Sequence, residues 1–517
     1  MRSAPALSGE AAGVRASLPT SPYAARLYAE GLAKLRIWDY LGARELLQKA
    51  VALEPQYALG HSALSAAWLG LGYQEQAREE ARIAVDTSAA LSTEQRFWVE
   101  GHYRETTREF DKAIEIYRKL RSGAPDDIEY GLRLASVQTA AGKANEGLAT
   151  LQELRNLPSP IKDDPRIDLA EAVAAESVSD FRRENSLALH AAATATAQGA
   201  RLLVARARLT GCSALDYLHD LKNAMSACEE AKAIYASAGN PQGVVTTLLN
   251  MGNVFADRGE LDQANQVYEE SLKISRQLGN QASTASALNN IAADLNEQGD
   301  FTGATKMYRE ALVIKREVGA KDEIARTLYN LGNVFLAQGA LSDAEKMYDE
   351  SLRISQEIGD KEGMANAELN SADLFRKRGD LARAQRRYDE ARATYDQTQD
   401  KDGVAYALVG TAGVLTVQGD LSGAQKAYEQ ALEISRSIDD KHEVGFALCG
   451  LGDLSLIKGD TAEAKKRYGE ALSLRKQLGE KANTAEVQVA LATVTLEEGH
   501  PSEVQTRIRE AQEEFRK

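Results

Sequence analysis

Cysteine and proline are both scarce in this chain of 517 residues, and each shortage excludes a class of protein. The cysteines, Cys212, Cys228 and Cys449, are odd in number and widely spaced, so neither a zinc site nor a disulfide framework is predicted. They are expected to be core thiols, which fits a reducing compartment and a cytoplasmic location. Pro241 is the only proline between residues 166 and 500, so helices can run without interruption there.

The residue patterns that carry catalysis or cofactor binding are missing. The six histidines are scattered singly, without metal-ligand spacing. No phosphate-binding or dinucleotide-binding glycine motif, no H-E-x-x-H, no G-x-S-x-G and no protein-kinase signature occurs. We therefore predict that the chain is not an enzyme and that it holds no cofactor and no metal.

Positive charge is in the minority, with 62 Lys and Arg against 76 Asp and Glu and a formal net charge of −14. This balance argues against nucleic acid as a partner, because phosphate binding needs a basic face, and against an anionic membrane surface. No apolar run approaches the roughly 20 residues of a membrane span. Residues 1–20 lack the apolar core of a secretory signal and are expected to be a flexible lead-in.

The chain does contain a repeat with a period of 40 residues, marked by three ladders of residues in one register. The tyrosine ladder is Tyr268, Tyr308, Tyr348, Tyr388, Tyr428 and Tyr468. The glycine ladder is Gly259, Gly299, Gly339, Gly379, Gly419, Gly459 and Gly499. The alanine ladder is Ala264, Ala304, Ala344, Ala384, Ala424 and Ala464. Self-similarity at this period indicates stacked structural repeats.

Each repeat has the pattern of two helices joined by a turn. In Val244–Asp257, the apolar residues Leu248, Met251 and Phe255 fall on one helical stripe, and Gly259 follows where a left-handed residue can end the helix. The segment from residue 261 to 278 carries a second helical pattern. The small alanine lets the two helices approach closely, and the tyrosine is expected to fill the core between repeats rather than to act as an acid.

The spacing of glycine, then alanine five residues on, then an aromatic residue four beyond, resembles the tetratricopeptide (TPR) repeat. Residues 328–361, LYNLGNVFLAQGALSDAEKMYDESLRISQEIGDK, match this pattern over their whole length. The 40-residue form resembles the repeats of Pins-type spindle-orientation proteins, kinesin light chains and bacterial peptide-sensing regulators. The resemblance implies an all-α fold, a right-handed superhelical TPR solenoid of stacked helix-turn-helix repeats.

The spacing changes before residue 165, where repeats of about 34 residues fit better. Residues 17–172 resemble the TPR segment attached to bacterial serine/threonine kinases and winged-helix regulators. The predicted division is listed here in chain order: a lead-in at 1–20, an N-terminal TPR array at 21–157, a proline-rich joint at 158–165, the 40-residue array at 166–482 and a capping repeat at 483–517.

A ladder of polar residues marks the candidate partner-binding groove. Its first position holds Asn250, Asn290, Asn330 and Asn370, and its second holds Asn253, Asn333, Asp373 and Asp453. An amide offers both a donor and an acceptor, which suits an extended peptide backbone. The resemblance implies that the first helix of each TPR lines the concave groove and that asparagines there hold partner peptides. The alternative is that these amides bond neighbouring helices across the stack.

Basic residues beside this ladder, Arg326, Arg376 and Lys377, are predicted to meet an acidic side chain or a chain terminus. Together these patterns predict a non-catalytic scaffold that binds a protein or extended peptide in bacterial signalling. Two alternatives remain: a receptor for a short signalling peptide, and the regulatory part of a kinase or transcriptional regulator. The sequence does not predict the oligomeric state or the identity of the partner.

Overall fold

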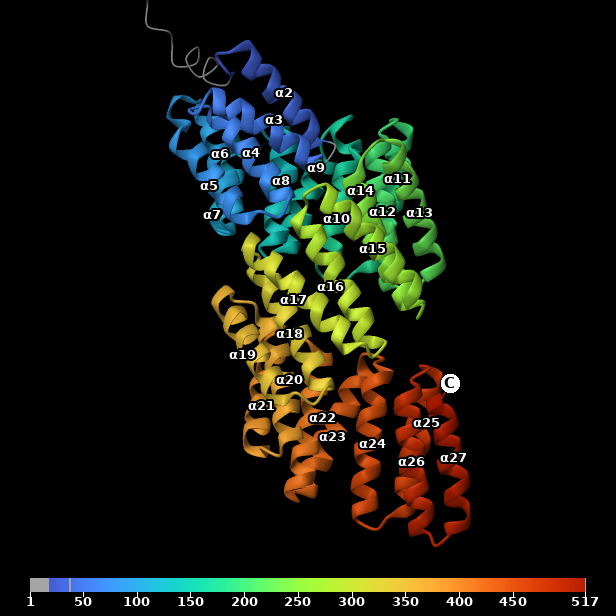
Figure 1. Ribbon diagram of the computed structural model, residues 1–517. Helices are drawn as coiled ribbons and strands as arrows, with labels where there is room; N and C mark the ends of the chain where they lie inside the picture. Colours follow the sequence, from blue (N-terminus) through green and yellow to red (C-terminus); the bar gives the residue numbers. More distant parts are fainter. Residues whose placement is uncertain (1–17, 37–38, 517) are drawn as a thin grey trace, which may run out of the picture. The chain divides into compact units, whose positions relative to one another are not determined.

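The computed structural model describes residues 18–36 and 39–516, and this part of the chain is built from α-helices (Figure 1). It contains 26 α-helices and two short 3-10 helices, and no strand occurs among the described residues. The predicted all-α solenoid is therefore confirmed. Most of the lead-in predicted at 1–20 lies outside the described residues. The chain divides into two compact units, residues 1–320 and 321–517.

The first unit contains eight helical hairpins, in which each first helix packs against the second helix that follows it. The first helices are α2 (Pro22–Arg36), α4 (Ala58–Gly70), α6 (Thr93–Thr106), α8 (Ile128–Ala140), α10 (Pro165–Glu176), α12 (Arg201–Tyr217), α14 (Pro241–Asp257) and α16 (Gln281–Glu297). The second helices are α3 (Tyr40–Leu53), α5 (Gln74–Asp86), α7 (Phe110–Gly123), α9 (Ala144–Arg155), α11 (Phe181–Ala197), α13 (Leu221–Ser237), α15 (Leu261–Gln277) and α17 (Phe301–Val318). The 3-10 helices are η1 (Ser88–Ala90) and η2 (Ile161–Asp163).

The second unit contains five hairpins of the same kind. Its first helices are α18 (Lys321–Ala337), α20 (Lys361–Arg378), α22 (Lys401–Gln418), α24 (Lys441–Ile457) and α26 (Lys481–Glu497). Its second helices are α19 (Leu341–Ile358), α21 (Leu381–Thr398), α23 (Leu421–Ser437), α25 (Thr461–Gln477) and α27 (Pro501–Arg516). All ten helices follow the 40-residue period, so each hairpin is one repeat.

The glycine ladder forms the turn inside each hairpin from α14–α15 to α26–α27, as the sequence predicted. Gly379 has a φ of +82°, a left-handed conformation that ends α20 at little cost because glycine has no Cβ. Asp380 follows it, and its carboxylate accepts a hydrogen bond from the backbone N–H of Arg383 at the start of α21. A left-handed glycine followed by an aspartate cap therefore stops one helix and starts the next.

The tyrosine ladder is buried, which confirms its predicted packing role. Tyr348 and Tyr388 are fully buried. The ring of Tyr348 lies against Gly332 of the same hairpin, where an added Cβ would come within 2.5 Å of a ring carbon. A large residue thus faces a residue with no side chain 16 positions earlier, and the two helices of the hairpin close around the ring.

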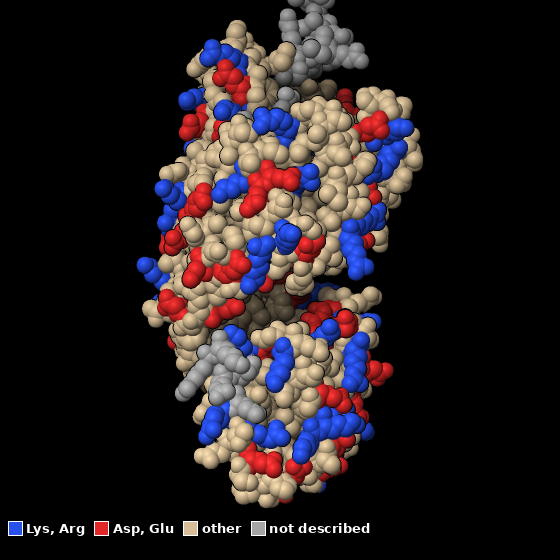
Figure 2. Space-filling model, turned by 90° about the vertical axis from the view of Figure 1, so that its right-hand side faces the viewer, with Lys and Arg blue, Asp and Glu red and all other residues tan. Residues whose placement is uncertain are grey.

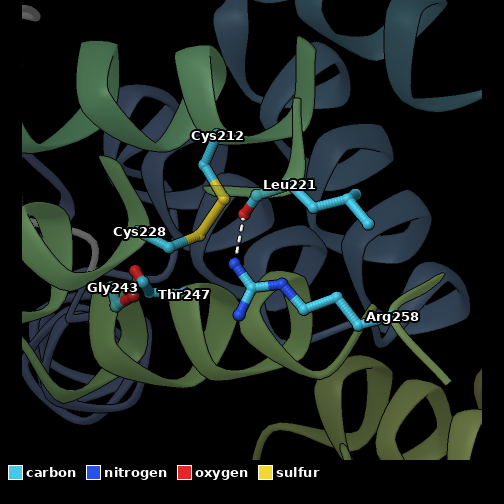
Figure 3. The surroundings of a disulfide bond; sticks show 6 residues. All are labelled: Cys212, Leu221, Cys228, Gly243, Thr247 and Arg258. Atoms are coloured by element: carbon cyan, nitrogen blue, oxygen red, sulfur yellow. Dashed lines mark hydrogen bonds between the residues drawn. A yellow bond between two sulfur atoms is a disulfide. The ribbon is translucent and has the colours of Figure 1, made fainter. Parts of the chain in front are cut away.

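Two of the cysteines occupy this same pair of positions, and here the sequence prediction is wrong. Cys212 on α12 and Cys228 on α13 are 16 residues apart and form a disulfide, whereas they were expected to be separate core thiols (Figure 3). The reason is the hairpin register: two medium-sized residues replace the glycine and tyrosine of the other repeats, so their side chains meet. Beside them, the guanidinium of Arg258 donates to the backbone oxygen of Leu221 at 2.6 Å.

Breaking this disulfide is expected to destabilise the α12–α13 hairpin by about 3 kcal/mol, because the bond closes a loop of about 15 residues in the unfolded chain. The change is the double substitution Cys212→Ser and Cys228→Ser. Urea unfolding with and without a thiol reductant, combined with hydrogen exchange on α12 and α13, measures the loss. Cys449→Ser is the control, because Cys449 is not disulfide-bonded. Equal stability of the double variant and the wild type would contradict the expectation.

The N-terminal hairpins of the first unit also contact its last repeats, far away in sequence. The amide of Asn280 donates to the backbone oxygen of Gly70 at 3.4 Å, and Gly72 lies close against Ala282. These contacts join the N-terminal array to the 40-residue repeats in one compact unit. The proline-rich joint at 158–165 therefore lies inside the first unit, and the boundary between the units falls at 320. The predicted boundaries between the 34-residue array, the joint and the 40-residue array describe where the type of repeat changes, and they stay a prediction.

Candidate functional site

The first helices of the second unit form an inner layer. In successive repeats α18 contacts α20, α20 contacts α22, and α22 contacts α24. Side chains on these helices line two cavities, and most of the polar residues predicted for this unit lie beside one of them. The candidate site therefore lies along the first helices of the second unit.

The amide cavity, as we name the first, has a volume of about 320 Å³. Its polar lining comes from α18, α19, α20 and the residue before α20: Asp322, Glu323, Arg326, Tyr329, Asn330, Ser351, Ser355, Asp360, Glu362 and Asn366. Arg326 is exposed and Asn330 is half-buried, so both predicted residues border the open space. The hydroxyl of Tyr395 donates to the amide oxygen of Asn366 at 2.6 Å, which fixes the orientation of that amide.

The second position of the polar ladder is bonded inside the stack. In the second unit the amide oxygen of Asn333 accepts from the Tyr348 hydroxyl at 2.7 Å and from the amide of Asn370 at 2.9 Å. In the first unit Asn253 accepts from the Tyr268 hydroxyl at 2.7 Å and from the amide of Asn290 at 3.1 Å. A tyrosine and two amides from neighbouring repeats thus form the same arrangement twice.

Four residues that were predicted to line the groove therefore form hydrogen bonds between repeats: Asn253, Asn290, Asn333 and Asn370. Each asparagine oxygen at the second position receives two donors, so its acceptor capacity is used. Asn250 is half-buried on α14, in the same register as Asn330. The arrangement favours Asn330 of the first position for contact with a partner, whereas Asn290 and Asn370 of that position bond to the second position and help to hold the stack.

The remaining predicted residues lie on α20. The carboxylate of Asp373 accepts from the hydroxyl of Tyr388 at 2.5 Å and pairs with the guanidinium of Arg376 at 3.4 Å. Arg376 also donates to the Tyr388 oxygen at 3.3 Å. Lys377 is exposed in the last turn of α20. Asp373 and Arg376 border the second cavity, and no contact brings Lys377 to it.

The acidic cavity, as we name this second space, has a volume of about 170 Å³. Its lining combines carboxylates, aromatic rings and bare backbone: Asp373, Arg376, Tyr406, Val409, Gly410, Gly413, Tyr428, Glu443 and Phe446. The sequence did not single out Glu443, which is 2% exposed and has no hydrogen-bond partner for either carboxylate oxygen.

The repeat register gave no signal for Glu443. In the four preceding repeats the same position holds Ser283, Glu323, Gly363 and Gly403, so it varies between charged, polar and small residues. The special environment of Glu443 is visible only in the structure. Burial and the nearby carboxylates raise the pKa of Glu443 to about 8, so its carboxyl is mostly protonated at neutral pH.

Neither a nucleophile nor a metal site accompanies these cavities in the described residues. Burial raises the pKa of the Cys449 thiol to about 12, which keeps it protonated. No group of three His, Cys, Asp or Glu side chains is placed to hold a metal ion within residues 18–36 and 39–516. On the face drawn in Figure 2, acidic and basic side chains are interspersed. No described helix combines the length and apolar character required to cross a membrane.

The architecture defines the class of protein as a solenoid of helical hairpins, and three family models narrow that class. The MalT-like TPR region matches residues 364–517, and two tetratricopeptide repeat models match residues 283–357 and 244–278. The chain is a tetratricopeptide-repeat protein. Repeats of this kind serve as scaffolds for protein interaction. The matched ranges all follow residue 243, so the family resemblance of the N-terminal third stays a prediction.

Solved structures with a similar fold cover much of the chain at low sequence identity. A Rap protein complexed with Competence and Sporulation Factor is 15% identical, with 67% of this chain and 99% of that chain covered and a TM-score of 0.47. Yeast Tom70 is 17% identical, with 94% and 97% covered and a TM-score of 0.45. BtubC from P. vanneervenii is 19% identical, with 42% and 92% covered and a TM-score of 0.39. No curated protein sequence matches this chain.

Proposed function

We propose that the chain is a non-catalytic TPR scaffold that binds a protein segment or an extended peptide along the first helices of its second unit, in bacterial signalling. The single observation that carries the proposal is the amide cavity, where Arg326 and Asn330 border open space. An amide can pair with a peptide backbone, and a guanidinium can hold a carboxylate. Because Asp322, Glu323, Asp360 and Glu362 line the same cavity, Arg326 suits one carboxyl group of the peptide, from an acidic side chain or a free carboxyl end, rather than an acidic stretch.

The geometry refines which residues make the contact. Asn333 accepts hydrogen bonds from the amide of Asn370 and from the hydroxyl of Tyr348, so the main contribution of these two amides is to hold the inner layer in place. We therefore assign contact with the ligand to the side chains of Asn330 and Arg326. The inner helices are fixed by a packed stack, so the ligand binds a preformed surface and less of its binding free energy is spent on ordering the protein.

The experiment begins by selecting displayed random peptides on the immobilised full chain and titrating an enriched peptide into variants. The double substitution Arg326→Ala and Asn330→Ala is expected to weaken binding by about tenfold or more, because it removes one charge-assisted and one neutral hydrogen bond. Its melting temperature should stay within about 2 °C of the wild type, since neither side chain is part of the core.

Two further variants separate binding from folding. Arg353→Ala, an exposed arginine on the second helix α19, is the matched control and should bind the peptide normally. Asn370→Ala should lower the melting temperature, because it removes a bond between repeats. The proposal is wrong if no peptide is enriched, or if the double variant binds the enriched peptide as tightly as the wild type does.

A further inference from the structure

The acidic cavity combines features that point to a positively charged ligand group. Glu443 is buried at its wall, yet neither of its carboxylate oxygens has a hydrogen-bond partner. A buried polar group without a partner costs free energy and is uncommon in folded proteins, and a bound ligand is one explanation for it. The cavity that Glu443 borders has room for a small group such as an alkylammonium.

Aromatic rings form the other walls of this cavity. Tyr406, Tyr428 and Phe446 come from α22, α23 and α24 and line the space together with Glu443. The faces of aromatic rings attract cations, and an ammonium group among such rings is stabilised further by a carboxylate. Gly413 leaves the backbone of α22 bare on this side and keeps the space open, whereas the space beside Gly410 is filled by the ring of Tyr388.

The charges around Glu443 also favour a cation. The carboxylates that act on it come from three elements: Asp373 on α20, Asp402 on α22 and Asp440 before α24. The cations nearby are already paired. Arg376 pairs with Asp373, and Arg475 pairs with Glu480 and lies 3.9 Å from the ring centre of Phe446. His442 also contacts Glu480, through Nδ1 at 2.5 Å.

We propose that the acidic cavity binds an ammonium group of the peptide ligand, from a lysine side chain or a free amino terminus, with Glu443 as its counter-ion and the three rings as its walls. This proposal rests on the proposed function, since it names one chemical group of that ligand. In the empty cavity Glu443 is protonated. When the ammonium group enters, the Glu443 carboxyl releases its proton to solvent and the resulting carboxylate pairs with the cation.

The test uses small probes, so that it does not depend on the peptide selection. The full chain carries ¹³C-labelled glutamate carboxyls, and the signal that is absent in Glu443→Gln identifies Glu443. The pKa of this carboxyl is measured by NMR in n-butylammonium chloride, in glycinamide hydrochloride, and in n-butanol with sodium chloride at the same ionic strength. Glu433→Gln, which removes an exposed carboxylate on α23, is the matched control.

We expect n-butylammonium or glycinamide to lower the pKa of Glu443 by at least one pH unit relative to n-butanol with sodium chloride. The stronger of the two probes identifies a lysine side chain or an amino terminus as the ligand group. Affinity for that probe should fall at least tenfold in Glu443→Gln and remain unchanged in Glu433→Gln. Equal titration of Glu443 in all three solutions, or equal affinity of Glu443→Gln and wild type, would overturn the proposal.

A failure here can be told apart from a failure of the proposed function. If selected peptides bind and depend on Arg326 and Asn330, but neither ammonium probe affects Glu443, the scaffold function stands and the ammonium site is wrong. If the probes act on Glu443 and no peptide is ever enriched, the acidic cavity binds ammonium groups and the peptide-scaffold function is wrong.

Discussion

Tyr348→Ala is expected to lower the free energy of unfolding of the second unit by about 3–5 kcal/mol. The ring is fully buried, it fills the space above Gly332, and its hydroxyl donates to Asn333 at 2.7 Å. The substitution removes the ring and its hydrogen bond to Asn333, and it leaves a cavity inside one repeat, beside Gly332. In a solenoid the loss is felt mainly by neighbouring repeats, so hydrogen exchange should accelerate over α18–α21 first.

Tyr348→Phe is the matched control for this experiment. It keeps the ring in place and removes only the hydroxyl, so a loss of about 1 kcal/mol is expected. Far-UV circular dichroism during urea unfolding and hydrogen exchange measured by mass spectrometry give the two values. If Tyr348→Ala unfolded at the same urea concentration as Tyr348→Phe, the ring would not be a packing element and the account of the repeat core would be wrong.

Raising the pH from 5 to 9 is expected to lower the free energy of unfolding of the wild-type second unit by roughly 4 kcal/mol. The Glu443→Gln variant should not show this loss. The pKa of Glu443 is raised from an ordinary value of 4.5 to about 8 by burial and by nearby carboxylates. The folded state therefore prefers the protonated carboxyl. The stabilisation that comes from the protonated Glu443 carboxyl is complete below about pH 4.5, falls as the pH rises and is gone once the pH passes about 8. Glutamine stays neutral throughout.

Hydrogen exchange on α24 is the measurement for this prediction, because it reports on the repeat that contains Glu443. Glu443→Gln should match the wild type at pH 5 and exchange more slowly at pH 9, after correction for the intrinsic pH dependence of exchange. Asp402, whose pKa is raised to about 6, is present in both proteins, so its effect cancels to first order. The exposed control Glu433→Gln should follow the wild type. If hydrogen exchange on α24 had the same pH dependence in the wild type and in Glu443→Gln, Glu443 would be exposed to solvent and the prediction would be wrong.

The repeat could be predicted in detail from the sequence because its structural rules act within 40 residues. A left-handed glycine defines each turn of the 40-residue repeats, with a capping aspartate after it in four of them, and a tyrosine opposite a glycine or alanine defines each core. The contacts of Asn280 with Gly70 and of Ala282 with Gly72 could not be predicted, since they join residues about 200 positions apart. The bond between Cys212 and Cys228 could have been predicted from the same hairpin register that places Tyr348 beside Gly332.

The candidate site was less predictable than the fold. The polar ladder identified the helix face that borders the cavities, but it did not separate Asn330 from Asn370, because that difference depends on the bond from Asn370 to Asn333 in the previous repeat. Glu443 was missed because its surroundings come from four helices. Position in the repeat therefore predicts the face of a helix, whereas the role of each polar side chain depends on the contacts of neighbouring repeats.

Photo-crosslinking of a selected peptide tests the central claim most directly. A peptide enriched on the full chain carries a photoreactive residue at successive positions, and mass spectrometry maps the attached residues. The account predicts crosslinks on the first helices α18, α20 and α22, near Arg326 and Asn330, and competition by the unlabelled peptide. Crosslinks confined to the second helices α19, α21 and α23, or to the first unit, would contradict it.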